Sequence, residues 1–119
     1  MATGFKGLNI WKKGFNLLMK AYDITDKYPK EEKYCLTDQT RRAANSIIAN
    51  IAESHGRYYY ADKVRVLYIS RGEVEETRSH LAVALGRKYI LTKESEILDR
   101  EYEGLSKGVS SYIYSLKNK

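Results

Sequence analysis

Apolar residues recur at steps of three and four along nearly the whole chain, and this period constrains the fold more than any other feature. Between Leu8 and Tyr28 one series comprises Trp11, Phe15, Leu18 and Tyr22, and a second comprises Gly14, Leu17, Ala21, Ile24 and Tyr28. Side chains spaced in this way lie on one wide face of an α-helix. The spacing predicts an amphipathic helix over residues 8–28. Pro29 should end it, because proline disfavours helical backbone in the residue before it.

Three further segments carry the same signal. Thr37 or Asp38 can cap a second helix that ends near Gly56, and a third spans Ala61–Gly86 with apolar positions at Val64, Leu67, Tyr68, Gly72, Val74, Leu81, Ala82 and Leu85. A fourth follows an N-cap at Thr92, and its seven-residue repeat comprises Leu98, Tyr102, Leu105, Val109, Tyr112 and Leu116. Pro29-Lys30-Glu31-Glu32 can form a short helical turn between the first two helices. Because short connections make neighbouring helices antiparallel, the sequence predicts an all-α, up-down-up-down four-helix bundle, a single domain over residues 1–119.

Composition excludes several other classes of protein. One proline and eight glycines are too few for an all-β chain with many turns, and the single cysteine, Cys35, excludes a disulfide framework. No apolar run approaches the roughly 20 residues of a membrane span, and the first residues lack a signal-peptide core. We therefore expect a cytoplasmic protein with no membrane partner.

Candidate catalytic and metal-binding residues are few. His55 and His80 are the two histidines, and they fall on different predicted segments with no cysteine nearby. Glu76 precedes His80 by four residues, which fits a surface ion pair better than a metal site. Glycine-rich phosphate-binding and nucleophile-elbow motifs are absent from the sequence. The sequence predicts no enzyme, no catalytic residue, no metal and no cofactor.

Charge gives the first positive indication of function. Twenty-one Lys and Arg against fifteen Asp and Glu give a net charge of +6, which favours a polyanionic partner. The candidate nucleic-acid contacts are Arg41, Arg42, Arg57, Lys63 and Arg65, and the candidate base-stacking residues are Tyr58, Tyr59 and Tyr60. Alternatively, the arginines pair with Asp38, Glu53 or Asp62 and the tyrosines pack between subunits. Since no base-reading motif is visible, binding to RNA or DNA should be largely independent of sequence.

The segment Leu36–Glu53 is the most distinctive part of the chain. Two arginines precede small residues that would let another helix approach closely. The segment resembles a four-helix-bundle family first noticed as open reading frames within intervening sequences of bacterial 23S rRNA genes. The family pattern R-R-A-x-x-S-I-x-x-N-I-A-E-G is matched by Arg41, Arg42, Ala43, Ser46, Ile47, Asn50, Ile51, Ala52 and Glu53. Ser54 stands in place of the usual glycine. Gly14 stands where alanine is common, which should weaken the first helix by about 1 kcal/mol.

The resemblance implies an assembly and a partner. Members of this family form barrel-shaped homopentamers, and a related protein is the accessory variability determinant of diversity-generating retroelements, which binds a reverse transcriptase and nucleic acid. By this resemblance we expect a basic, non-enzymatic oligomeric scaffold that binds RNA or DNA and serves a reverse transcriptase. Five copies would carry a charge of about +30. The alternative is a protein–protein adaptor with no nucleic-acid role.

Overall fold

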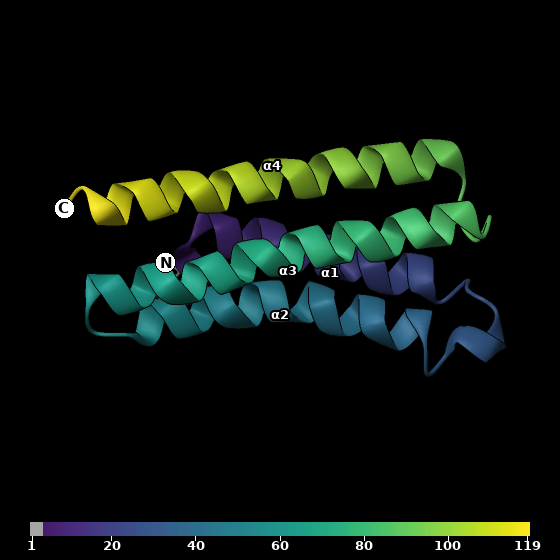
Figure 1. Ribbon diagram of the computed structural model, residues 1–119, viewed down its shortest axis with the longest axis horizontal. Helices are drawn as coiled ribbons and strands as arrows, with labels where there is room; N and C mark the ends of the chain where they lie inside the picture. Colours follow the sequence, from purple (N-terminus) through teal and green to yellow (C-terminus); the bar gives the residue numbers. More distant parts are fainter. Residues whose placement is uncertain (1–3) are drawn as a thin grey trace.

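Four long helices lie side by side in an elongated molecule of 46 × 28 × 23 Å (Figure 1). The structure is a computed structural model that describes residues 4–119. Its helices are α1 (Asn9–Thr25), α2 (Leu36–Gly56), α3 (Tyr60–Gly86) and α4 (Thr92–Lys117), with two short 3-10 helices, η1 (Gly4–Gly7) and η2 (Lys30–Glu32). Consecutive helices run in opposite directions in Figure 1, and residues 4–119 contain no strand. The predicted all-α four-helix fold is confirmed, and the up-down-up-down order agrees with the figure.

Helix boundaries differ from the predicted ones by a few residues. Helix α1 ends at Thr25, three residues before the predicted end at Tyr28. The helical turn that was predicted after Pro29 is present as η2. The predicted caps at Thr37, Asp38 and Thr92 are wrong, because the N-cap positions are Cys35 for α2 and Leu91 for α4. At the start of α4 the Glu94 carboxylate instead accepts a hydrogen bond from the Leu91 backbone N–H at 3.3 Å.

Helix α3 contributes a core stripe that the apolar pattern revealed only in part. Its buried positions follow a regular three-four alternation: Leu67, Ser70, Val74, Thr77, Leu81 and Ala84. The predicted core residues Tyr68, Gly72 and Ala82 are exposed. Two positions of the true stripe are polar, and their hydroxyls are satisfied by carbonyls: Ser70 donates to Ile47 O at 2.7 Å and Thr77 to Glu73 O at 2.8 Å. The predicted positions Leu67, Val74 and Leu81 are thus confirmed as core, and the apolar pattern missed the polar members of the stripe and Ala84.

Helix α4 confirms the predicted repeat with one exchange. Leu98, Tyr102, Leu105, Val109 and Leu116 are buried, but Tyr112 is only partly buried and Ile113 takes its place in the core. Tyr102 is fully buried at the centre of the bundle. Its hydroxyl has no hydrogen-bond partner among the described residues. Burial raises the pKa of the Tyr102 phenol well above its usual range.

Helices α1 and α2 approach each other closely at Gly14. A Cβ atom built on Gly14 would overlap Cγ2 of Ile48, a branched side chain with little freedom to move away. The expectation that Gly14 simply weakens helix α1 is thus incomplete. The glycine lowers helix propensity, but it also gives Ile48 the space it occupies between the two helices.

Candidate nucleic-acid interface

The junction between α2 and α3 positions the predicted contact Lys63. Ser54, which is 1% exposed, donates its hydroxyl to the Lys63 carbonyl at 2.9 Å. The Lys63 amine in turn donates to the His55 carbonyl at 2.9 Å and reaches the Ser54 carbonyl at 3.4 Å. These carbonyls belong to the last turn of α2, where backbone acceptors lack helical partners. Lys63 therefore caps the C-terminal end of α2. The Ser54 side chain, which a glycine would lack, links α2 to α3 through its hydrogen bond to the Lys63 carbonyl.

The two arginines next to this junction differ in their surroundings. The Arg57 guanidinium donates to the Glu53 carboxylate one turn earlier in α2. This hydrogen bond, together with the charge of Glu53, raises the pKa of Arg57. Arg65 is exposed on α3 and makes no ion pair with any described residue. Arg65 is therefore better placed than Arg57 to bind a phosphate, because its guanidinium has no carboxylate partner among the described residues.

The three consecutive tyrosines also separate into two environments. Tyr58 and Tyr59, 86% and 67% exposed, pack edge to face with ring centroids 4.9 Å apart. Tyr60 is the first residue of α3 and lines a groove between α3 and α4. The run therefore does not act as one aromatic surface.

Arg41 and Arg42 lie near the other end of α2. Arg41 donates from Nε to the Thr25 hydroxyl at 2.8 Å and from Nη2 to Asp26 at 2.7 Å, and it stacks 4.7 Å from the Tyr22 ring centroid. Arg41 thus ties α2 to the end of α1. Arg42, whose side chain is 79% exposed, pairs with Asp38 at 2.9 Å. An exposed pair of this kind contributes only about 0.3–0.5 kcal/mol, so Arg42 can exchange partners.

The five predicted cations do not form one patch. Arg41 and Arg57 are separated by more than four turns of α2, or roughly 24 Å at 1.5 Å per residue. The alternative partners Asp38 and Glu53 do pair with Arg42 and Arg57. The predicted contacts therefore form two groups at opposite ends of the helix, and whether they bind nucleic acid stays a prediction.

Charge is divided unequally between the two ends of the bundle. Three contacts show which helix segments lie at the same end of the bundle: Ile47 with Ser70, Arg71 with Ser110, and Ile10 with Gly108. We call the half formed by residues 4–16, 45–72 and 106–119 the basic half. It holds both described chain ends and the α2–α3 junction (Figure 1).

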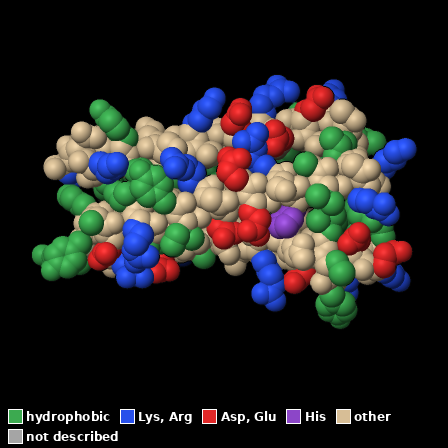
Figure 2. Space-filling view, in the orientation of Figure 1, with side chains coloured by type: hydrophobic (Ala, Val, Ile, Leu, Met, Phe, Trp, Pro, Cys, Tyr) green, Lys and Arg blue, Asp and Glu red, His purple; other side chains and the backbone are tan. Residues whose placement is uncertain are grey.

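The basic half carries ten Lys and Arg but only two Asp and Glu, Glu53 and Asp62. In the rest of the chain eleven Lys and Arg face thirteen Asp and Glu. On the face drawn in Figure 2, acidic side chains gather over the centre and right, away from the basic half at the left. The cations of this half are Lys6, Lys12, Lys13, Arg57, Lys63, Arg65, Arg71, Lys107, Lys117 and Lys119.

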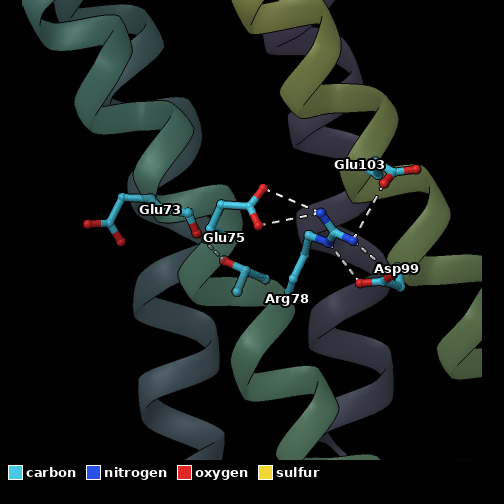
Figure 3. A network of polar contacts seen from close by, with 6 residues as sticks. Glu73, Glu75, Arg78, Asp99 and Glu103 are labelled. Atoms are coloured by element: carbon cyan, nitrogen blue, oxygen red, sulfur yellow. Dashed lines mark hydrogen bonds and ion pairs between the residues drawn. The ribbon is translucent and has the colours of Figure 1, made fainter.

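An ion-pair network in the other half neutralises one of its arginines (Figure 3). Arg78 on α3 binds both carboxylate oxygens of Asp99 on α4, at 2.8 and 3.1 Å, with Glu75 and Glu103 at 3.4 and 3.8 Å. The hydrogen bond from Arg78 lowers the pKa of Asp99. Glu73 points away from this network in Figure 3. The network joins α3 to α4 and leaves an excess of negative charge around Arg78.

The sequence and the fold identify the family. The model of the 23S rRNA-intervening sequence protein family matches residues 6–111, which is most of the chain. The chain belongs to this family. No curated protein matches the sequence.

A solved structure shows the same fold. The chain is similar to a protein of unknown function from the S23 ribosomal protein family of Bacteroides thetaiotaomicron VPI-5482. The two share 24% sequence identity, and the match covers 87% of this chain and 97% of the other with a TM-score of 0.80. At this identity the likeness establishes the fold.

The part of the chain that the structure describes contains no candidate metal centre. Residues 4–119 contain no group of three or more His, Cys, Asp and Glu side chains able to hold a metal ion. The predicted pairing of His80 with Glu76 is present, with the imidazole Nε2 3.4 Å from the carboxylate. Within the same residues, every helix is too short or too polar to cross a membrane.

Sequence reasoning missed most cations of the basic half. Lys6 and Lys13 lie about a hundred residues before Lys107 and Lys117 in the sequence. The two pairs share one half of the molecule only because the helices alternate in direction. The predicted topology contained the necessary signal, since it places the first and fourth helices side by side with both ends at the α2–α3 junction. Counting charges for each end of the predicted bundle would have revealed the asymmetry.

Proposed function

We propose that this protein is a non-catalytic scaffold that binds nucleic acid through its basic half. The observation that carries the proposal is the ratio of ten cations to two anions in that half, against a near balance elsewhere. A one-sided field of this kind attracts a polyanion and orients it before contact. Phosphate contacts by Lys and Arg supply most of the affinity of sequence-independent binding.

The side chains of the basic half suit phosphate binding. Lys12, Lys13, Lys107 and Lys117 are exposed, and none forms an ion pair with a described residue. Arg65 adds an exposed guanidinium on α3. Lysine binds phosphate as a flexible point charge and carries no information about the base, so we propose that the protein does not select a sequence.

Self-association is part of the proposal. Helix α1 presents an aromatic and apolar stripe, in which Trp11 stacks on Phe15 at 5.3 Å while Phe15, Met19 and Tyr22 are each about 40% exposed. Such a stripe on a small protein favours burial against another copy. Together with the family resemblance it supports a homopentamer, in which five basic halves would act on one nucleic acid. A reverse transcriptase as protein partner rests on the resemblance alone.

A matched pair of double variants on α4 tests the proposal. Lys107→Glu with Lys117→Glu reverses two exposed charges in the basic half, whereas Lys93→Glu with Arg100→Glu reverses two exposed charges at the other end of the same helix. Fluorescence anisotropy with a labelled RNA over a series of salt concentrations gives both affinity and the number of phosphates contacted. We expect the first variant to bind far more weakly and with a smaller salt slope, because each lost phosphate contact lowers the slope by about 0.7 to 0.9.

The control variant should retain most of the affinity. Equal losses in both variants would show that the basic half is not the interface. Failure of the wild-type protein to bind RNA or DNA at low salt would instead favour the adaptor function. Light scattering on the same samples should give a mass near five times 13.8 kDa, and a monomer would contradict the assembly.

A further inference from the structure

A groove opens in the basic half between the start of α3 and the end of α4. It has a volume of about 440 Å³ and is lined by Tyr60, Ala61, Val64, Leu116, Lys117 and Lys119. We call it the Tyr60 groove. Its volume lies within the range of roughly 300–1,000 Å³ that is usual for ligand pockets.

The lining residues of the groove suit a ligand that has a negative charge and an apolar or planar part. The walls are the small apolar side chains of Ala61 and Val64 together with Leu116, and Tyr60 adds an aromatic ring. Lys117 and Lys119 add two amines, and no Asp or Glu side chain is among the lining residues. A planar group against the ring and a negative charge beside the amines would both be accommodated.

Tyr60 differs from Tyr58 and Tyr59 because it alone of the three lines the groove. Tyr58 and Tyr59 pack against each other, whereas the Tyr60 side chain is 49% exposed within the groove. The start of α3 is also fastened to α2 by the hydrogen bond between Ser54 and Lys63. The ring is therefore held at a fixed place in the basic half.

We propose that the Tyr60 groove holds one unpaired base of a single-stranded nucleic acid, with Lys117 and Lys119 at the adjacent phosphates. The inference rests on the proposed function and specifies its substrate class. Bases of a single strand can turn outward and stack on an aromatic ring, whereas bases of a duplex are enclosed by their neighbours. The protein should accordingly prefer single strands to duplexes, although both carry phosphates.

Four proteins test the inference: the wild type, Tyr60→Leu, Tyr60→Phe and Tyr114→Leu. Tyr114 is a suitable control because it lies on the same half, is 70% exposed and does not line the groove. Affinity is measured for a short uridine homopolymer and for an RNA hairpin of equal charge, in which a polyethylene glycol linker closes the stem so that every base is paired. We expect Tyr60→Leu to lower affinity for the single strand by about five- to a hundredfold, the range for loss of one stacked base, while its salt slope and its affinity for the hairpin stay unchanged. Tyr60→Phe and Tyr114→Leu should bind like the wild type.

A second readout reports stacking directly. A strand that contains 2-aminopurine should lose fluorescence on binding the wild type and Tyr60→Phe, and much less on binding Tyr60→Leu at saturation. If Tyr60→Leu does not fold, Lys117→Gln with Lys119→Gln replaces it. This variant should lower the single-strand affinity and the salt slope and keep the 2-aminopurine quenching.

The failure of this inference is distinguishable from failure of the proposed function. Equal affinity for the single strand and the hairpin, with no effect of Tyr60→Leu or of the lysine pair, would overturn the assignment of the groove and leave nucleic-acid binding in place. Absence of binding to either RNA by the wild type would overturn both.

Discussion

The Ser70 hydroxyl on α3 donates a 2.7 Å hydrogen bond to the backbone carbonyl of Ile47 on α2, at a point where both residues are fully buried. A serine side chain is short, so this bond requires the backbones of the two helices to lie close together at this level. The contact lies between the α2–α3 junction and the middle of the bundle. It therefore helps to set the distance between the two helices that carry the candidate interface.

Two substitutions at Ser70 should separate the hydrogen bond from the close approach. Ser70→Ala removes the donor and should lower the free energy of unfolding by about 1 kcal/mol. Ser70→Leu adds volume where the helices meet and should lower it by about 1–3 kcal/mol, even though leucine is more apolar. Urea unfolding followed by circular dichroism measures both values. A leucine variant as stable as the wild type would show that the helices can move apart.

Gly14→Ala should destabilise the protein although alanine favours helix formation. The added methyl group would overlap Ile48, and overpacking of a filled core costs about 1–3 kcal/mol, which exceeds the gain of about 1 kcal/mol in helix propensity. Gly72→Ala is the matched control, because a Cβ atom there meets no described atom within 4 Å. That change should stabilise the protein by up to about 1 kcal/mol. Thermal unfolding of the two variants should shift in opposite directions.

Stability should fall as the pH rises above about 10. The phenols of unfolded tyrosines ionise near that pH. Burial raises the pKa of Tyr28 to about 12 and that of Tyr102 still further. Between these values the unfolded chain binds fewer protons than the folded one, so the free energy of unfolding decreases with pH.

Tyr102→Phe is the direct test of this dependence. It removes one buried titrating group and also a hydroxyl without a partner among the described residues, so it should flatten the alkaline profile and stabilise the protein by about 1–3 kcal/mol at neutral pH. Urea unfolding at neutral and alkaline pH gives both quantities. A destabilised Tyr102→Phe variant would show that the hydroxyl has a partner in solution, such as a buried water.

Lys63 and Arg65 should respond differently to the same substitution. Lys63→Gln removes the amine that caps the carbonyls of Ser54 and His55 and should lower the free energy of unfolding by about 1 kcal/mol. Arg65→Gln should leave stability nearly unchanged and reduce the salt dependence of RNA binding, because Arg65 is exposed and has no ion pair among the described residues. A large loss of RNA affinity in a fully stable Lys63→Gln variant would show that Lys63 leaves the cap to bind phosphate.

The spacing of apolar residues was sufficient to predict the fold and most of the α4 core, whereas the core of α3 was predicted only in part. Ser70 and Thr77 occupy core positions, so apolar Tyr68 and Ala82 on the exposed side made the predicted stripe appear continuous. On α4, Tyr112 and Ile113 are adjacent, and either can follow Val109 and precede Leu116 at steps of three and four. The spacing alone therefore could not show that Ile113 is the core residue.

The candidate interface was found in part. Arg57, Lys63 and Arg65 are close in sequence and stay close in the fold, whereas Lys13 and Lys107 come together only through the topology. The sequence also could not show that the end of α1 brings Asp26 and Tyr22 to Arg41. Local spacing thus predicts contacts within a helix or a junction, but not contacts between distant segments.

The location of the chain ends has a practical consequence. Residue 4 and Lys119 both lie in the basic half of a molecule 46 Å long (Figure 1). An affinity tag or a fused fluorescent protein attached after Lys119 would therefore lie beside the amines of Lys117 and Lys119. A tag with negative charges would compete with nucleic acid for those amines, and a histidine tag would add cations of its own. The turn between α3 and α4, where Lys88 and Leu91 are exposed, is at the opposite end and is the better site for a label. Binding studies should use untagged protein or one labelled in that turn.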